Sequence, residues 1–326
     1  MIATSIQSWV EEILAGNRRA LSRAITTVEN RALESYELLR KLFPHSGSAR
    51  IIGLTGSPGS GKSTLVDQLA REYRNRQLSV GVIAIDPTSP FTGGAILGDR
   101  IRMQRHSADP GIYIRSMATR GALGGLASTT ADVATVLDAS GRDVVLIETV
   151  GVGQDEVDIV RLADVTLVIL VPGMGDDVQS IKAGIMEIAD IFVINKSDRE
   201  GAERVEHEIR MLQSTTSARS ATNGESSGWT PPIIKTVASD GVGMPELAGA
   251  IAQYEAYLER SEVGRQRRVE NWRNRLLEMV RARLAERVSR EYLSNGAARQ
   301  FATEIAAHQR DPYALVDEIL GKLAGN

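Results

Sequence analysis

The stretch that decides the fold is Gly56-Ser57-Pro58-Gly59-Ser60-Gly61-Lys62-Ser63, which fits the pattern G-x-x-x-x-G-K-[ST]. A β-branched apolar run, residues 51–54, precedes it, and a helical segment opens at Ser63. Glycines let backbone N–H groups turn inward around phosphate oxygens, and the N-terminus of the next helix adds partial positive charge. This context predicts a phosphate-binding P-loop. We expect nucleotide contacts from Gly56, Ser57, Pro58, Gly59, Ser60, Gly61, Lys62, Ser63 and Thr64.

Two residues of this loop carry distinct expected roles. Lys62 is predicted to reach the β- and γ-phosphates, and the hydroxyl of Ser63 is predicted to bind Mg²⁺. Parallel strands present their carboxyl ends to a ligand, so the acids that follow apolar runs should face the same region. The metal and hydrolysis site is therefore expected to combine Lys62 and Ser63 with Asp86 and Glu148, and Asp99 would join them if its loop closes over the nucleotide. Mg²⁺ keeps several waters, through which these carboxylates would act.

A second motif, Asn195-Lys196-Ser197-Asp198, follows the apolar run 191–194 and fits N-K-x-D. The paired oxygens of the Asp198 carboxylate match the N1–H and N2–H₂ donors of guanine, a donor pair that adenine lacks. Asn195, Lys196 and Asp198 are therefore predicted to bind guanine, with the backbone N–H of Ala238 directed at its O6 atom. The expected ligands are GTP and GDP with Mg²⁺.

The rest of the chain predicts an α/β architecture with a mostly parallel sheet. Near-continuous apolar runs alternate with helical segments, as a sheet covered on both faces requires. The runs are residues 51–54, 80–85, 144–147, 165–171, 191–194 and 233–237. Residues 214–232 are polar and are expected to form an exposed loop.

Helical patterns flank the sheet region on both sides. Apolar side chains recur at helical spacing near the N-terminus. They are Trp9, Ile13, Leu21, Ile25, Val28, Leu33, Tyr36, Leu39 and Phe43. The expected division is an N-terminal helical extension at 1–46, a nucleotide-binding domain at 47–258 and a C-terminal helical arm at 259–326. Trp272, Leu276, Met279 and Leu284 would form an apolar stripe on the arm, which predicts a homodimer.

Composition excludes several other classes of protein. The chain has 326 residues, a formal charge of −3 and no cysteine, which rules out disulfides, thiolate metal sites and thiol catalysis. The acidic balance argues against nucleic acid as a ligand, although arginines cluster between 265 and 275. Neither a signal peptide nor a membrane-spanning segment is expected, so the predicted compartment is the cytoplasm.

Longer strings in the chain resemble one particular family. They are GLTGSPGSGKST, IDPTSPFTGGAILGDRIRM, ETVGVGQDEVDI, VPGMGDDVQSIKAGIMEIADIFVINKSD and the C-terminal DPY. Together they resemble the MeaB-like GTPases, which include the human methylmalonic aciduria type A protein and ArgK. These proteins are chaperones of adenosylcobalamin-dependent acyl-CoA mutases. The resemblance runs over about residues 5–258 and more loosely to the end.

The resemblance implies a GTP-dependent gate for cobalamin loading that also protects and rescues the mutase. Gly151, Gly153 and Gln154 would sense the γ-phosphate, as switch segments of other GTPases do. The segment Gly173–Lys182 matches the family's third switch, in which we expect Asp176, Asp177 and Lys182 to meet the partner. One departure is Asp155, which stands where the family usually has serine.

Other readings remain open from the sequence. A kinase on the same P-loop would transfer phosphate to a protein or a small molecule, although N-K-x-D disfavours ATP as its donor. The scattered histidines, His45, His106, His207 and His308, disfavour the related nickel-insertion GTPases. The partner mutase is not identified: methylmalonyl-, isobutyryl-, ethylmalonyl- and 2-hydroxyisobutyryl-CoA mutases all fit.

Overall fold

The computed structural model describes residues 5–86, 109–118, 125–149, 162–173, 188–222 and 228–324. These residues belong to two compact units, Met1–Arg268 and Val269–Asn326. The first unit holds the sheet and the helices that cover it. The second is entirely helical in its described part.

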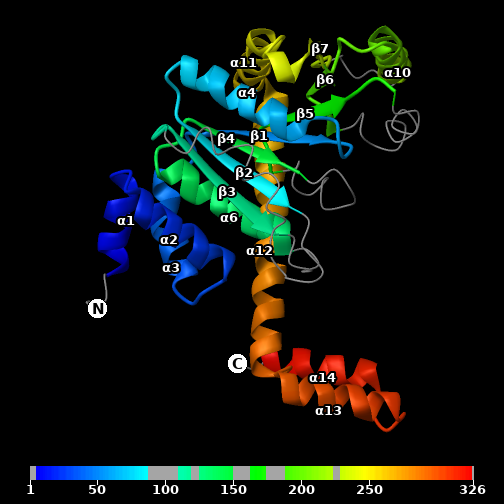
Figure 1. Cartoon of the computed structure of the whole chain (residues 1–326). Helices are drawn as coiled ribbons and strands as arrows, with labels where there is room; N and C mark the ends of the chain where they lie inside the picture. Colours follow the sequence, from blue (N-terminus) through cyan, green and yellow to red (C-terminus); the bar gives the residue numbers. More distant parts are fainter. Residues whose placement is uncertain are drawn as a thin grey trace. The chain divides into compact units, whose positions relative to one another are not determined.

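A seven-stranded sheet in the order β3-β2-β4-β1-β5-β6-β7 forms the centre of the first unit (Figure 1). Every pair of neighbouring strands is parallel, which confirms the predicted α/β class. β1 lies between β4 and β5, with Leu54 beside Glu148 and Gly56 beside Ile169. The strands are β1 (Arg50–Gly56), β2 (Val80–Asp86), β3 (Ile112–Ala118), β4 (Val144–Glu148), β5 (Val165–Leu170), β6 (Ile191–Asn195) and β7 (Ile233–Thr236).

Helices cover both faces of this sheet, as near-continuous apolar strands require. On one face, α4 (Lys62–Asn75) and α11 (Met244–Arg260) enclose a core with β1, β4 and β5. On the other, α6 (Gly125–Ala139) packs on β2 and β4, and α10 (Ala202–Thr222) packs on β5 and β6.

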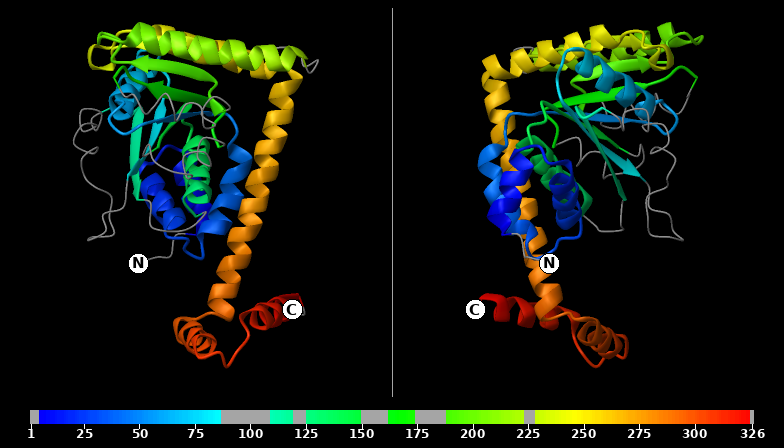
Figure 2. Two further views of the ribbon diagram at one scale, coloured as in Figure 1. Left: turned by 90° about the vertical axis from the view of Figure 1, so that its right-hand side faces the viewer. Right: turned by 60° about the vertical axis from the view of Figure 1, so that its left-hand side comes forward.

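Three N-terminal helices extend this second layer instead of forming a separate body. α1 (Ile6–Leu14), α2 (Arg18–Glu29) and α3 (Ser35–Leu42) lie beside α6 (Figures 1 and 2). Their apolar faces share one hydrophobic cluster with α6 and the strands β2, β3 and β4. Trp9 links α1 to α2, because its indole N–H donates a hydrogen bond to the carbonyl of Ala20 at 3.0 Å.

Two apolar residues predicted in this pattern are not part of the core. Leu33 is 78% exposed in the turn between α2 and α3, and Phe43 is 51% exposed in the short 3₁₀ turn η1 (Phe43–His45). Both lie outside α1, α2 and α3, so the helical spacing does not place them on the buried face of a helix. Leu38 and Leu42 fill the core in their place.

One strand of the sheet was not predicted from the sequence, and one predicted loop is partly helical. β3 was not predicted, and it forms an edge of the sheet beside β2. Residues 214–222 were expected in an exposed loop, but they continue α10 to Thr222. Trp229, in the same predicted loop, is partly buried, and its ring centroid lies 4.9 Å from that of Tyr254.

Asp190, just before β6, forms hydrogen bonds with several of these segments. Its carboxylate accepts two hydrogen bonds from Arg267, at 2.7 and 2.9 Å, and one from the backbone N–H of Thr166. Its carbonyl accepts the indole N–H of Trp229 at 2.8 Å. Arg267 belongs to α12 (Glu262–Glu291), so the first turns of that helix belong to the first unit.

The second unit contains the rest of α12, followed by α13 (Asn295–Ala306) and α14 (Pro312–Ala324). The last helix begins at Pro312. Among the described residues of this unit, Leu315 and Ile319 are the buried apolar side chains. No helix in the described part of the chain is both long and apolar enough to cross a membrane.

Candidate active site: the P-loop and the loops beside it

The turn from β1 into α4 has the backbone geometry of a phosphate cradle. Gly56, Gly59 and Gly61 all have positive φ, at 147°, 79° and 90°. A Cβ atom at Gly56 would lie 2.3 Å from the carbonyl oxygen of Ile169, and one at Gly61 would lie 2.4 Å from the side-chain amide nitrogen of Asn195. Only glycine fits at these two positions, because the Ile169 oxygen is part of the β5 backbone and the Asn195 amide is held by its bond to the Ser60 carbonyl.

Lys62 is the first residue of α4 and folds its side chain back over the loop. Its ammonium group donates to the carbonyls of Gly56 at 2.6 Å and Ser57 at 3.0 Å. The side chain is buried, with 6% of the residue exposed. A positive charge is thus held inside the loop at the N-terminus of a helix, where the helix dipole also favours an anion.

Ser63 and Glu148 bring two oxygen ligands together beside this charge. The Ser63 hydroxyl donates to Oε1 of Glu148 at 2.6 Å, and Glu148 is buried at the end of β4. Thr149 fixes this strand end, since its N–H and hydroxyl both bind the Leu54 carbonyl. Oxygen donors of this kind fit Mg²⁺, which takes its remaining ligands from water and substrate phosphates. The described residues contain no cluster of three or more metal-ligating side chains, so such an all-protein metal cage is not found among them.

The other predicted acids are only partly placed. β2 ends at Asp86, beside the end of β4, which puts its backbone at the same edge of the sheet. Several expected residues lie outside the described part of the chain. They are Asp99, Gly151, Gly153, Gln154, Asp155, Asp176, Asp177 and Lys182.

The N-K-x-D motif contacts the P-loop directly. The side-chain amide of Asn195 donates to the carbonyl of Ser60 at 2.8 Å, although the two residues are 135 positions apart. Lys196 has a positive φ of 55°, and its ammonium group donates to the carbonyl of Gly59 at 2.7 Å. Asp198 is exposed, so its carboxylate is available to a ligand. The loop that carries N-K-x-D is therefore hydrogen-bonded to the P-loop through two side chains.

The turn after β7 completes this arrangement through Asn195. The side-chain oxygen of Asn195 accepts from the Thr236 hydroxyl at 3.2 Å and from the Ala238 N–H at 3.1 Å. The Ala238 N–H, expected to meet guanine O6, is thus engaged with Asn195 in this structure, and its role toward the base stays a prediction. Thr236 is fully buried and orients the amide, a role that the sequence analysis did not assign.

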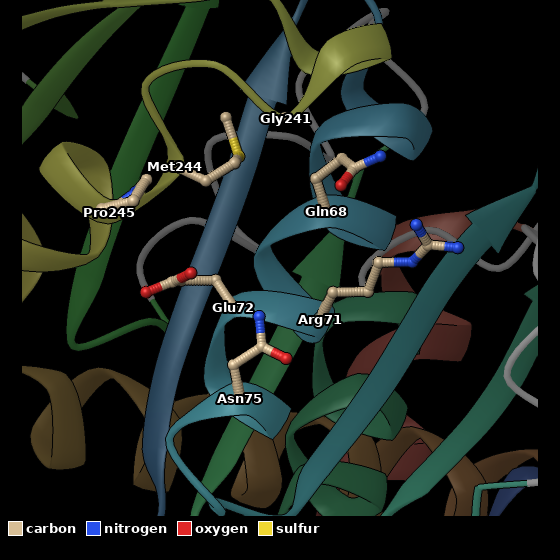
Figure 3. Close-up of a pocket in the computed structure, with 7 residues that line it drawn as sticks. All are labelled: Gln68, Arg71, Glu72, Asn75, Gly241, Met244 and Pro245. Atoms are coloured by element: carbon tan, nitrogen blue, oxygen red, sulfur yellow. The ribbon is translucent and has the colours of Figure 1, made fainter.

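A shallow pocket of about 390 Å³ lies beside this turn but does not include any predicted site residue. Figure 3 shows it between α4 and the start of α11. Its charged side chains have partners, since Arg71 pairs with Asp67 and Glu72 pairs with Arg76. The lining residues are Gln68, Arg71, Glu72, Asn75, Gly241, Met244 and Pro245.

Comparison with known proteins now identifies the family. The profile of a family described as "Methylmalonyl Co-A mutase-associated GTPase MeaB" matches residues 21–292. The chain belongs to the MeaB family. It is therefore a P-loop GTPase that binds guanine nucleotide.

Relatives of this MeaB protein extend over nearly the whole chain. A Pyrococcus abyssi protein named as a GTPase is 49% identical over 320 residues, which cover 98% of this chain and 97% of that protein. The GTPase ArgK of Escherichia coli is 35% identical over 88% of this chain and 86% of its own length. The mitochondrial methylmalonic aciduria type A homologue of Caenorhabditis elegans is 33% identical over 77% of this chain and 66% of its own length.

A solved structure shares the fold of the MeaB protein. The crystal structure of an LAO/AO transport system kinase superposes with a TM-score of 0.68 and 24% identity, covering 99% of both chains. The comparison supports the architecture of sheet and helices alone.

Proposed function

We propose that this GTPase couples GTP hydrolysis to an adenosylcobalamin-dependent acyl-CoA mutase, gating the loading of cobalamin and protecting or reactivating that enzyme. The observation that supports a nucleotide switch is the direct bond from Asn195 to the P-loop carbonyl of Ser60. This bond, together with the one from Lys196 to the Gly59 carbonyl, joins the proposed base-binding loop to the phosphate-binding loop. The mutase as partner is supported by the family's description and by the methylmalonic aciduria type A homologue.

In this proposal each residue of the cradle has one task. Lys62 leaves the carbonyls of Gly56 and Ser57 and neutralises the β- and γ-phosphate oxygens. Ser63 and Glu148, with Asp86 and Asp99, hold Mg²⁺, which would neutralise phosphate charge. Asn195 and Lys196 fix the loops, and Asp198 reads guanine. The backbone N–H groups of the glycine-rich turn hold the phosphates in line for attack by water.

The proposed coupling is tested by adding the host's mutase to the full-length protein. We expect GTP turnover to rise when the mutase is present, because in this proposal the partner binds the two nucleotide states of the protein with different affinities. Asp176→Ala, Asp177→Ala and Lys182→Ala should lose this stimulation and keep basal hydrolysis. Phosphate release into water, with no label on protein or metabolite, separates hydrolysis from the kinase alternative.

A matched control is Glu37→Ala, an exposed change on α3 that should keep full stimulation. If no cobalamin-dependent mutase of the host binds or stimulates the wild type, the chaperone role is wrong and the GTPase activity alone remains.

We also propose that the second unit forms a homodimer. Its helices bury few apolar side chains but expose many, and such a small unit cannot offset its conformational entropy by itself. The exposed set on α12 and α14 is Val269, Trp272, Leu276, Leu277, Met279, Val280, Leu284, Tyr313, Val316 and Leu320.

Light scattering on the full chain tests this assembly. Leu276→Glu places a charge in the exposed stripe, where Leu276 is 59% exposed, and should convert a dimer to a monomer at micromolar concentration. Ala285→Glu adds the same charge nine residues further along α12, on the side of the helix opposite Leu276, and should leave the dimer intact. A dimer of unchanged affinity in Leu276→Glu would place the interface elsewhere.

A further inference from the structure

A group of ionisable side chains lies at the edge of the sheet where β1 begins, opposite the end that carries the P-loop. Glu255, in the second half of α11, faces Arg50, the first residue of β1, with 3.4 Å between Oε2 and Nε. Asp164, just before β5, accepts the N–H of Ile51 at 2.9 Å. None of these residues has a task in nucleotide binding.

Two buried oxygens in this group lack a hydrogen-bond partner in the structure. One is Oε1 of Glu255, and the other is the hydroxyl of Tyr73, which projects from α4 and is 2% exposed. Buried polar atoms are almost always paired, and an unpaired one costs free energy. An unpaired oxygen on an ionised carboxylate would cost more, so this site favours a neutral carboxyl.

Burial and two neighbouring carboxylates also favour the neutral form of Glu255. Burial raises the pKa of Glu255 to about 7; the Arg50 guanidinium opposes the shift, while Asp164 and Glu259 add to it. Arg50 gives limited support, because half of its side chain is exposed. Burial, with Glu255 as the next cause, raises the pKa of Tyr73. The remaining charges nearby are Glu72 and Arg76, which act on Tyr73, and Asp138, Arg267 and Arg268, which act on Asp164.

We propose that Glu255 is a proton-dependent contact that holds the second half of α11 on β1 and α4, tightly when its carboxyl is neutral and more loosely when it is ionised. Ionisation places a negative charge near the carboxylates of Asp164 and Glu259 and on a buried oxygen that has no hydrogen-bond partner. α11 runs from the turn after β7 to the start of α12, so the contact regulates packing at the far end of the nucleotide-binding domain.

The direction of the pH effect follows from where the proton is held. Between about pH 4.5 and pH 7 the folded protein keeps a proton that the unfolded chain releases, so this group lowers stability as pH rises through that window. Glu255→Gln removes the effect. The difference in free energy of unfolding between Glu255→Gln and the wild type should therefore grow in favour of the variant from pH 5 to pH 8 and then stay constant.

Trp229 provides a local reporter of the same contact. Its ring lies 4.9 Å from that of Tyr254 and 5.5 Å from that of Tyr257, the residues on either side of Glu255 on α11. In a full-length Trp9→Phe, Trp272→Phe background, its fluorescence should change with a midpoint near pH 7. The change should be lost in Glu255→Gln.

The experiment combines urea unfolding at pH 5, 6, 7 and 8 with ¹³C NMR of glutamate-labelled wild type, in which Glu255→Gln assigns the resonance. We expect a carboxyl titration near pH 7 and a urea midpoint difference that widens with pH. Glu246→Gln, which removes an exposed carboxylate from the first turn of α11, should show no widening. A Glu255 resonance that titrates near 4.5 overturns the proposal, even if the glutamine variant does not fold. So does a midpoint difference that is the same at every pH.

Discussion

Lys62→Ala should abolish most GTP turnover, with kcat lowered by about 10²- to 10³-fold, as happens when a preorganised donor to a developing charge is removed. The ammonium group is buried and held by the Gly56 and Ser57 carbonyls, so no other side chain can replace it without rebuilding the loop. The measurement is single-turnover release of phosphate from GTP.

A control must separate lost chemistry from a disordered loop. Lys62→Arg keeps the positive charge but replaces the compact ammonium group with a planar guanidinium. This variant should recover part of the GTP binding and little of the hydrolysis rate. Thermal unfolding of both variants without nucleotide should stay close to that of the wild type. Turnover in Lys62→Ala equal to that of the wild type would mean that the P-loop does not serve hydrolysis.

Asp198→Asn should shift the base preference from guanine to xanthine. The substitution would remove two charge-assisted hydrogen bonds to guanine, of about 1.5–3 kcal/mol each. This corresponds to a loss in GTP affinity of about 10²- to 10⁴-fold. Xanthine carries a carbonyl where guanine has its amino group, so an asparagine amide at this exposed position matches it. Calorimetry with GTP, ATP and xanthosine triphosphate measures the change.

Glu200→Gln is the matched control, because it removes an exposed carboxylate from the same loop. Its preference for GTP should not change. Equal affinity of the wild type for ATP and GTP would show that Asp198 does not read the base.

Local sequence was enough for the parts of the fold whose residues are contiguous. The apolar runs became buried parallel strands because both faces of the sheet are covered, which leaves little place for polar side chains. The P-loop could be predicted for a similar reason. Its glycines, lysine and serine follow one another, and a strand and a helix fix the turn between them.

Some elements were missed because their sequence signal is weak. β3 carries Arg115, whose side chain pairs with Glu29 of α2, so the strand does not show a simple apolar pattern. The end of α10 is rich in serine and threonine, which favour turns, yet an existing helix gains one hydrogen bond for each residue added.

The sequence by itself determined which residues could serve a nucleotide, since motif spacing and base chemistry are written in short segments. Tertiary structure alone decided how they meet. Ser63 binds Glu148 across 85 positions, and Asn195 binds Ser60 across 135. Such contacts depend on strand order, which places β4 and β5 on either side of β1. Tertiary structure also decided the Glu255 contact. The burial of this side chain, and the unpaired oxygens of Glu255 and Tyr73, exist only once α4, α11 and β1 have packed together.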